Sequence, residues 1–339
     1  MRIRLGVVGL GESWERRHKP ALLRMTDKFE VRALYDEVAH RTRVQAAELE
    51  CDAVDGFTCL IDRDDIDAVY LLGTSWCGVE PIRAACRAKK PIFLARPFGP
   101  STPFADDVID LLESSGIRFM VEFPWRFYPA TIRLMELLAS GLGSPQLGFC
   151  SHHVMLAEKA DSLTHRTDAA AGDAILHMAD WLRFVFSCNP TSTRSLGEYQ
   201  PSHGPSRGFE TLVVEFGNTG VGQATLRRFV QPQWTEASSF HRPSSFEVVA
   251  EHGMAFLEMP GEITWFDQSG RHDESLEMDR PLGEMLADRF YRIIVHGLNP
   301  SPGLNDMVWA RSMVVSARQR YDQDQATSLP DSTRGKVAG

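Results

Sequence analysis

The turn after the first predicted strand constrains the fold of this chain more than any other feature. The apolar run IRLGVVG begins at Ile3 and ends in Gly9-Leu10-Gly11, and a helical pattern follows. A strand that turns through glycines into a helix is typical of dinucleotide-binding folds. The first glycine allows the tight turn, and the second lets backbone amides approach a pyrophosphate. Trp14 stands at the usual third glycine, so we expect a loop that is wider or one residue longer.

An acidic residue ends the second predicted strand. The apolar run from Glu30 to Tyr35 is followed by Asp36. A carboxylate at this place can accept hydrogen bonds from both hydroxyls of a ribose and repels a 2′-phosphate, so the pattern favours NAD(H) over NADP(H) as the cofactor. The alternative is a turn that needs glycine for a positive φ, followed by an aspartate that only caps the next helix.

Strands and helices alternate through the first third of the chain. After the first two strands we expect helices at 40–49, 79–88 and 103–114, and strands at 67–73, 91–94 and 118–123. The repeated β-α-β order predicts a doubly wound parallel sheet.

The pattern changes near Pro124. Segments rich in β-formers and separated by glycine turns are expected at 146–156, 209–216, 221–230, 244–250, 253–258 and 262–266, with helices at 129–140, 169–186, 281–296 and 303–320. We therefore predict an α/β protein with a dinucleotide-binding domain at 1–123 and a C-terminal α+β domain at 124–322. The large, open sheet of the second domain should be mostly antiparallel. Residues 323–339 are polar, and we expect them to form a frayed tail.

Net charge and cysteine spacing limit the partners. At a formal charge of -9 the chain repels nucleic acid and anionic membranes, and no basic block offsets this charge locally. The six cysteines show no CxxC pair and no zinc-type spacing, so we expect reduced thiols and no metal site. The sequence shows no signal-type core and no window that approaches a membrane span, which favours a cytoplasmic protein without membrane or nucleic-acid partners.

Three polar residues share one face of the long helix predicted in the C-terminal domain. Asp173, His177 and Asp180 are spaced i, i+4 and i+7. Oxidation of a carbinol needs a group that takes the hydroxyl proton as hydride leaves carbon, and a histidine held by a carboxylate suits this role. Alternatively, Asp173 complements the helix dipole and His177 is a partly buried partner of Asp180. Of His152 and His153, at most one can face the same cleft, because neighbouring strand residues point to opposite faces.

Together these motifs resemble the Gfo/Idh/MocA oxidoreductase family from Arg2 to about Tyr321. The resemblance rests on VVGLG with a downstream His18, the strand that ends in Asp36, RPFGP at 96–100, RFYP at 126–129, and Asp173-x-x-x-His177-x-x-Asp180. It implies an N-terminal Rossmann domain, an open C-terminal sheet used for homodimer or homotetramer packing, and a sugar, inositol or related polyol as the small-molecule substrate. The implied reaction is NAD-dependent hydride transfer between a secondary alcohol and a ketone.

The chain departs from the family pattern where that pattern usually reads Glu-Lys-Pro, with a lysine that donates to the reacting oxygen. This sequence has Ala95-Arg96-Pro97 instead. Arginine keeps a positive donor near the substrate oxygen but does not give up its proton near neutral pH. By resemblance, Arg96 acts as an electrostatic clamp, and Thr74, Arg96 and Pro97 lie beside the cofactor.

The resemblance also assigns Arg126, Asp173 and His177 to the substrate cleft, with His177 as the acid or base and Asp173 as the residue that orients it. Arg126 could instead pair with an acid, and Arg96 could be a surface or cofactor-facing arginine without a catalytic part.

Loss of the Glu-Lys pair leaves two other classes of function open. One is a protein that retains the dinucleotide for an internal redox step in elimination or epimerisation, or senses it, and the other is a binding partner with an empty cleft.

Overall fold

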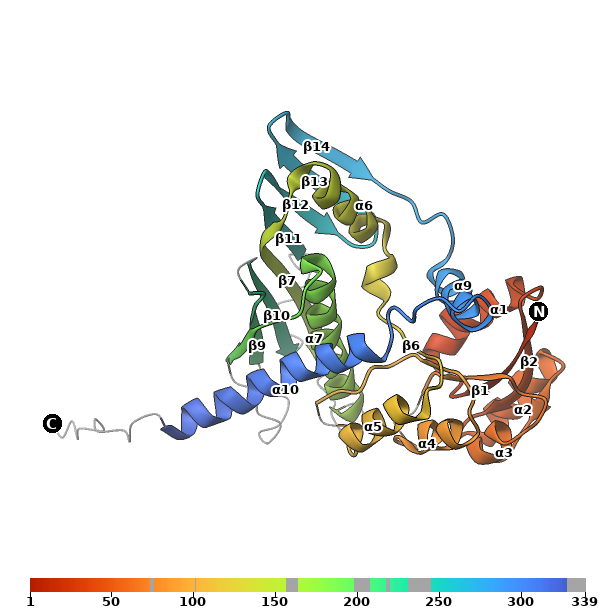
Figure 1. The fold of residues 1–339 in the computed structure, drawn as a ribbon. Helices are drawn as coiled ribbons and strands as arrows, with labels where there is room; N and C mark the ends of the chain where they lie inside the picture. Colours follow the sequence, from red (N-terminus) through yellow and green to blue (C-terminus); the bar gives the residue numbers. More distant parts are fainter. Residues whose placement is uncertain are drawn as a thin grey trace.

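Two β-sheets, each packed against helices, make up the chain (Figure 1). The computed structural model describes residues 1–73, 76–100, 102–156, 164–197, 208–217, 220–230 and 245–327. The first sheet is built from the N-terminal part of the chain and the second from the C-terminal part, in the order that the sequence predicts.

The N-terminal sheet, sheet A, has six parallel strands in the order β3-β2-β1-β4-β5-β6. These strands are β1 Ile3–Val8, β2 Phe29–Tyr35, β3 Asp52–Ala53, β4 Ala68–Leu71, β5 Ile92–Leu94 and β6 Phe119–Val121. β4, β5 and β6 are buried along their whole length, as expected where helices cover both faces of a parallel sheet. This strand order is that of a Rossmann fold and confirms the predicted fold class.

Helices cover both faces of sheet A. One face packs against α1 (Lys19–Arg24), α2 (Ala39–Glu48) and, from far along the chain, α9 (Leu282–Val295). The other face packs against α3 (Phe57–Ile61), α4 (Glu80–Arg87) and α5 (Ala105–Ser115). Phe290 anchors α9 in this layer, since its ring packs edge-on against Tyr70 and Phe93 with centroid distances of 5.5 and 5.7 Å.

The C-terminal sheet, sheet B, has eight strands in the order β14-β13-β12-β11-β7-β10-β9-β8. They are β7 Pro145–Leu156, β8 Ser192–Leu196, β9 Gly208–Glu215, β10 Val221–Val230, β11 Ser245–Ala250, β12 Gly253–Glu258, β13 Glu262–Asp267 and β14 Gly270–Ser275. Neighbours pair antiparallel except β7 and β10, which pair in parallel. The mostly antiparallel sheet confirms the prediction.

Helices α6 (Pro129–Leu137), α7 (Thr164–Phe186) and α10 (Leu304–Thr327) pack on one face of sheet B, with α7 running along it in Figure 1. The opposite face carries partly exposed apolar side chains, among them Leu147, Phe149, Phe256 and Phe266. Cross-strand register puts Phe149 and Phe256 in one row and Leu147 and Phe266 in the next. This outer face is therefore partly apolar, with Glu247 of β11 between Phe149 and Phe256.

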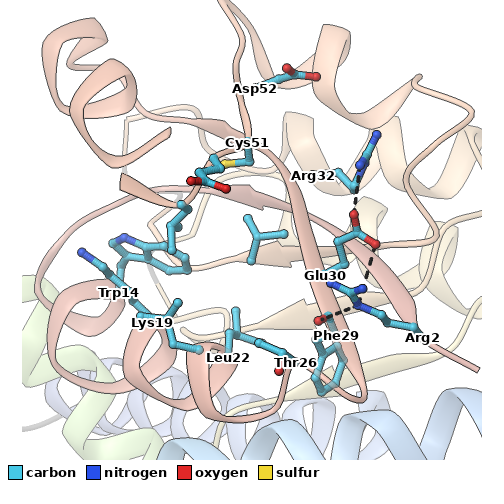
Figure 2. A pocket seen from close by; sticks show the side chains of 14 residues that line it. Arg2, Trp14, Lys19, Leu22, Thr26, Phe29, Glu30, Arg32, Cys51 and Asp52 are labelled. Atoms are coloured by element: carbon cyan, nitrogen blue, oxygen red, sulfur yellow. Dashed lines mark hydrogen bonds and ion pairs between the residues drawn. The ribbon is translucent and has the colours of Figure 1, made fainter. Parts of the chain in front are cut away.

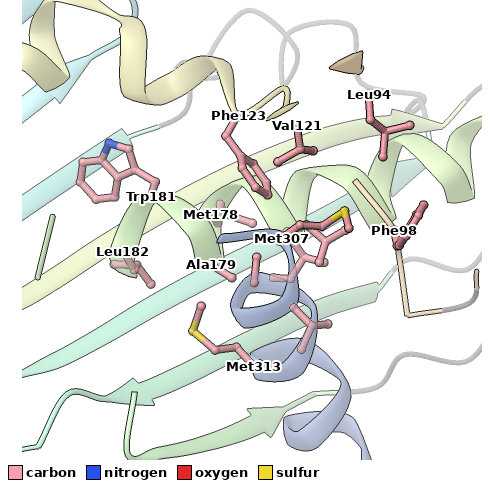
Figure 3. Packing of buried hydrophobic residues seen from close by; sticks show 14 of the residues in the cluster. Leu94, Phe98, Val121, Phe123, Met178, Ala179, Trp181, Leu182, Met307 and Met313 are labelled. Carbon is pink, nitrogen blue, oxygen red and sulfur yellow. The ribbon is translucent and has the colours of Figure 1, made fainter. Parts of the chain in front are cut away.

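A hydrophobic core joins the two sheets. Figure 3 shows Leu94 and Val121 of sheet A close to Met178 of α7 and Met307 of α10. All four side chains are fully buried. Because this core is continuous, the carboxyl edge of sheet A and one face of α7 are held in a defined relation.

Some element boundaries differ from those expected. α7 begins at Thr164, before the predicted start at residue 169, and α10 continues to Thr327, past the expected start of the tail at 323. Polar residues lower helix stability only slightly, so a packed helix can extend through them. A π-helical turn, η1 (Trp14–His18), precedes α1.

Candidate active site

The glycine turn after β1 has the shape of a cofactor cradle. Gly9 has a φ of +92°, and a Cβ there would lie 2.4 Å from the backbone nitrogen of Gly73 after β4. Only glycine fits this close approach. A Cβ on Gly11 would meet no described atom within 4 Å. Gly11 therefore faces open space at the start of the following helix, where backbone amides can receive a pyrophosphate.

Asp36 closes one end of this cradle. It directly follows β2 and is 4% exposed. Its Oδ2 accepts the Leu10 amide at 2.7 Å, and its Oδ1 accepts the Val38 amide and Nη1 of Arg41, both at 3.0 Å. Asp36 thus holds the glycine turn through Leu10, and it follows β2 where a ribose-binding acid stands in dinucleotide-binding folds. A carboxylate has about four acceptor sites, so about one is left for a ribose hydroxyl while Arg41 stays in place.

Trp14 points away from the loop. It is fully buried, and its indole N–H donates to Gln45 of α2 at 3.1 Å. A π-turn takes one more residue per hydrogen-bonded turn than an α-turn, so η1 accommodates an extra residue at the start of the helix. Figure 2 shows Trp14 with Lys19 and Leu22 at a cavity of about 290 Å³. No residue of the glycine turn lines this cavity, so it is not the cofactor cradle.

Arg96 and Pro97 follow β5 at the carboxyl edge of sheet A, beside the end of β6. Ligands of open α/β sheets bind beyond this edge. Pro97 is buried and Arg96 is partly exposed, and the charge of Arg96 helps to lower the pKa of His177. The two residues therefore share one electrostatic environment. Thr74, the predicted cofactor contact after β4, lies outside the described residues.

His177 of α7 lies against the residues that follow β6. Its ring packs edge-on against Phe123 and Trp125, with centroid distances of 5.6 and 5.7 Å. Part of the side chain reaches solvent, but Nε2 is buried and has no hydrogen-bond partner among the described residues. Burial, together with nearby basic side chains, first among them Arg17, lowers the pKa of His177 to about 3. The imidazole is therefore neutral at neutral pH.

The preceding strand contributes one histidine to this side of the sheet. The His152 ring lies 6.1 Å from the Trp125 ring, and His152 adds to the lowering of the His177 pKa. Nε2 of His153 lies 3.3 Å from Oγ of Ser151. Alternation along β7 puts the two histidines on opposite faces of the sheet, as the sequence predicts.

Asp173 belongs to α7, one turn before His177. Its side chain lies outside the described residues, so its role as the residue that orients His177 stays a prediction.

Arg126 and Asp180 form a buried ion pair. Arg126 lies in the short helix η2 (Pro124–Phe127), and its Nε donates to Oδ2 of Asp180 at 2.7 Å. Its Nη2 contacts Asp180 as well and donates to Oδ1 of Asp306 at 3.0 Å. Burial raises the pKa of Asp180 to about 6 while Arg126 opposes this rise, so Asp180 is ionised at neutral pH. These contacts favour the alternative in which Arg126 pairs with an acid instead of binding substrate. They also give Asp180 a partner other than His177.

Two charged residues that sequence reasoning missed lie at the domain junction. Glu122, directly after β6, is 2% exposed, and its Oε1 contacts Nη1 of Arg17 in η1. Its Oε2 lies 3.1 Å from Nε2 of the buried His18, although no hydrogen bond forms in this geometry. The signal that could have revealed this pair is an acidic residue inside the apolar run FMVEF, because a buried carboxylate needs a partner.

Within the described residues, no three His, Cys, Asp or Glu side chains come together as metal ligands would. No helix in that part of the chain is long and apolar enough to span a bilayer.

The candidate site consists of the glycine turn, Asp36, the ends of β5 and β6, and one face of α7.

Known proteins resemble this chain in both sequence and fold. Residues 3–123 match the GFO_IDH_MocA family model, described as an oxidoreductase family with an NAD-binding Rossmann fold. An inositol 2-dehydrogenase from Acidothermus cellulolyticus is 27% identical over 216 residues, which cover 62% of this chain and 62% of the relative. A dTDP-3,4-didehydro-2,6-dideoxy-alpha-D-glucose 3-reductase from Streptomyces antibioticus is 32% identical over 145 residues, which cover 41% of this chain and 42% of the relative.

A solved aldose-aldose oxidoreductase from Caulobacter crescentus superposes with a TM-score of 0.80 at 14% identity, over 96% of this chain and 98% of that one. At this identity the likeness shows a shared fold. The chain spans less than two thirds of the length of both curated relatives. The likeness in sequence to the Gfo/Idh/MocA family thus lies in residues 3–123, and the shared fold extends over nearly the whole chain.

Proposed function

We propose that the protein is an NAD-dependent oxidoreductase that interconverts a secondary alcohol and a ketone on a sugar, inositol or related polyol. The observation that carries this proposal is the position of His177. Its neutral ring, with a buried and unpartnered Nε2 among the described residues, lies at the carboxyl edge of sheet A in the electrostatic environment of Arg96. The relatives named for inositol and for a deoxysugar nucleotide support the substrate class.

The side chains at the junction have distinct roles in this reaction. A bound nicotinamide would accept or supply the hydride. His177 takes the hydroxyl proton during oxidation and returns it during reduction, and Asp173 orients the imidazole from one turn earlier on α7. Arg96 keeps its proton at neutral pH and stabilises the negative charge that develops on the substrate oxygen. Thr74 and Pro97 complete the nicotinamide side of the cradle.

His177→Ala should abolish turnover and leave NAD affinity nearly unchanged, because His177 lies on α7 and not in the glycine cradle. Arg96→Lys should raise the rate, because lysine supplies a proton donor that arginine does not. Both variants are assayed by NADH formation across a panel of polyols, with NADH binding measured in parallel. Unchanged turnover in His177→Ala would remove this residue from the mechanism.

We propose that the cofactor is NAD(H) in preference to NADP(H). The support is Asp36, whose carboxylate stands at the ribose position and repels a 2′-phosphate. Arg41 acts against this preference for NAD(H). Its guanidinium pairs with Asp36 at 3.0 Å and is partly exposed, so its positive charge attracts a 2′-phosphate. Separate titrations of NADH and NADPH, followed by tryptophan quenching and nicotinamide emission, test the preference. Tighter NADPH binding would contradict it.

A second candidate function is a protein that retains its dinucleotide and uses it for an internal redox step in elimination or epimerisation. The observation that favours it is Arg96, which cannot exchange a proton as a lysine can. Such a protein should be purified with bound cofactor and should release no NADH with any polyol. Cofactor released by heat denaturation and measured by absorbance distinguishes the two candidates.

We propose further that the protein is a homo-oligomer, a dimer or a tetramer, that packs through the outer face of sheet B. The support is the partly exposed aromatic side chains on this face, Phe149 and Phe256 in one row of the sheet and Phe266 in the next. Apolar patches of this kind mark protein interfaces. Light scattering coupled to gel filtration measures the oligomeric state directly.

A further inference from the structure

The ion pair between Arg17 and Glu122 has no part in the reaction proposed above. Glu122 is buried at the carboxyl edge of sheet A, and its Oε1 contacts Nη1 of Arg17. The nearby His18 does not balance this carboxylate, because burial lowers its pKa to about 3 and keeps it neutral. Among the described residues, Arg17 is therefore the cation that compensates Glu122, and the pair fixes the position of the guanidinium.

The other side of Arg17 faces a cavity. The Arg17 side chain is 36% exposed and lines a space of about 660 Å³ between the η1–α1 segment and the start of α9. Arg16 and Arg24 line the same space, together with their partners Glu12 and Glu284. The ion pairs of Arg16 with Glu12 and of Arg24 with Glu284 use Nη1 of each arginine, as the pair with Glu122 does. A guanidinium has five N–H donors, so each arginine retains donors for a ligand.

Arg17 also belongs to the electrostatic environment of the C-terminal domain. Its charge lowers the pKa of His177 more than the charges of His152 and Arg96 do. It opposes the rise in the pKa of Tyr128 that burial causes. The geometric connection is Glu122, which contacts Arg17 and directly precedes Phe123, whose ring lies 5.6 Å from that of His177.

We propose that Arg17, positioned by Glu122, binds an oxyanion of the substrate in this cavity, and that the substrate is a sugar-like molecule with a carboxylate or a phosphate. Guanidinium groups bind both anions through paired N–H donors. The proposal rests on the proposed function, because Glu122, which holds Arg17, directly precedes Phe123, and the Phe123 ring packs against His177. Arg17 is a binding residue in this scheme, and Glu122 is a positioning residue.

The test uses protein saturated with NADH, so that phosphate probes cannot occupy the glycine cradle. Glucose, glucuronate and glucose 6-phosphate are titrated by calorimetry into the wild type and three variants. The double variant Arg17→Met/Glu122→Gln removes both charges and leaves no buried carboxylate unpaired. Arg17→Lys keeps the cation. Arg43→Met on α2 removes an exposed arginine outside the cavity and serves as the control.

We expect the wild type, Arg17→Lys and Arg43→Met to bind at least one acidic sugar about tenfold tighter than glucose. The double variant should lose this preference and keep its affinity for glucose. A preference for glucuronate alone identifies a carboxylate substrate, and a preference for glucose 6-phosphate alone identifies a phosphate. An equal affinity for acidic and neutral sugars in the wild type, or an undiminished preference in the double variant, overturns the inference. Failure of the wild type to bind NADH contradicts the proposed function instead.

Discussion

At the scale of single residues, Gly9 and Gly11 differ although both belong to one turn. Gly9→Ala places a Cβ 2.4 Å from the Gly73 nitrogen in a left-handed conformation, so it should lower the free energy of unfolding by about 1–3 kcal/mol. Gly11→Ala meets no described atom, so its stability should stay near that of the wild type while its NADH affinity falls about tenfold or more. Thermal unfolding and NADH titration of both variants check this contrast. Tight NADH binding by Gly11→Ala would show that the cradle lies elsewhere.

Two histidines with lowered pKa values make stability depend on pH. The pKa values of His18 and His177 are lowered to about 3 in the folded protein. An unfolded histidine takes up its proton near pH 6.5, so the unfolded state binds more protons between these values. Stability should be full above pH 6.5 and should fall as the pH decreases, by up to about 1.4 kcal/mol per pH unit for each histidine. Urea unfolding from pH 7.5 to 4.5 measures this slope.

The control for the pH dependence is His18→Gln, which removes one of the two titrating groups. Its slope between pH 6.5 and 4.5 should be smaller than that of the wild type by about one bound proton. An identical slope would mean that His18 is already protonated in the folded protein, as a partner of Glu122.

At the scale of elements, Arg126 ties three helices together. It lies in η2 and donates to Asp180 of α7 and Asp306 of α10. Arg126→Met leaves two buried carboxylates without this partner and should cost about 3–5 kcal/mol in unfolding free energy. Arg133→Met removes a half-exposed contact of α6 with Glu274 and should cost about 1 kcal/mol or less. Urea titration of both variants gives the comparison, and equal losses would argue against a structural role for Arg126.

The elements also show how far sequence reasoning reaches. β1, β4 and β5 are short apolar runs, and the inner strands of sheet B alternate, so local pattern predicts most strands of both sheets. β3, β8 and β14 were missed, because β3 has only two residues and the segments STRSL and GRHDES lack that alternation. The π-turn at Trp14 was missed because it depends on packing against Gln45 of α2. Likewise, local context is enough to propose Gly9 and Asp36 as cofactor-binding residues, but the pair of Arg17 with Glu122 joins residues that only the fold brings together.

At the scale of the whole molecule, the partly apolar outer face of sheet B predicts the surface through which subunits pack. Phe149→Lys/Phe256→Lys puts two charges into one row of the apolar face and should convert the oligomer to monomers. Neither side chain lies near the glycine cradle, so the affinity for NADH should not change. Light scattering and NADH titration measure the two effects. An intact oligomer would place the interface on another surface.

The path of the chain between the sheets also belongs to this scale. We propose that the N-terminal domain ends after Phe123, as the change in sequence pattern indicates, and that α9 is added to it by the returning chain. Phe290 of α9 completes the aromatic layer formed by Tyr70 and Phe93, and α10 then crosses back to sheet B.

This return has a consequence for synthesis on the ribosome. Residues up to Phe123 emerge well before α9, and at about 5–20 residues per second the delay is roughly ten to thirty seconds. During that time the side of sheet A that carries Tyr70 and Phe93 has no α9 to cover it. The nascent cofactor domain therefore presents an aromatic surface of the kind that chaperones bind, and it reaches its final stability only when translation is nearly complete.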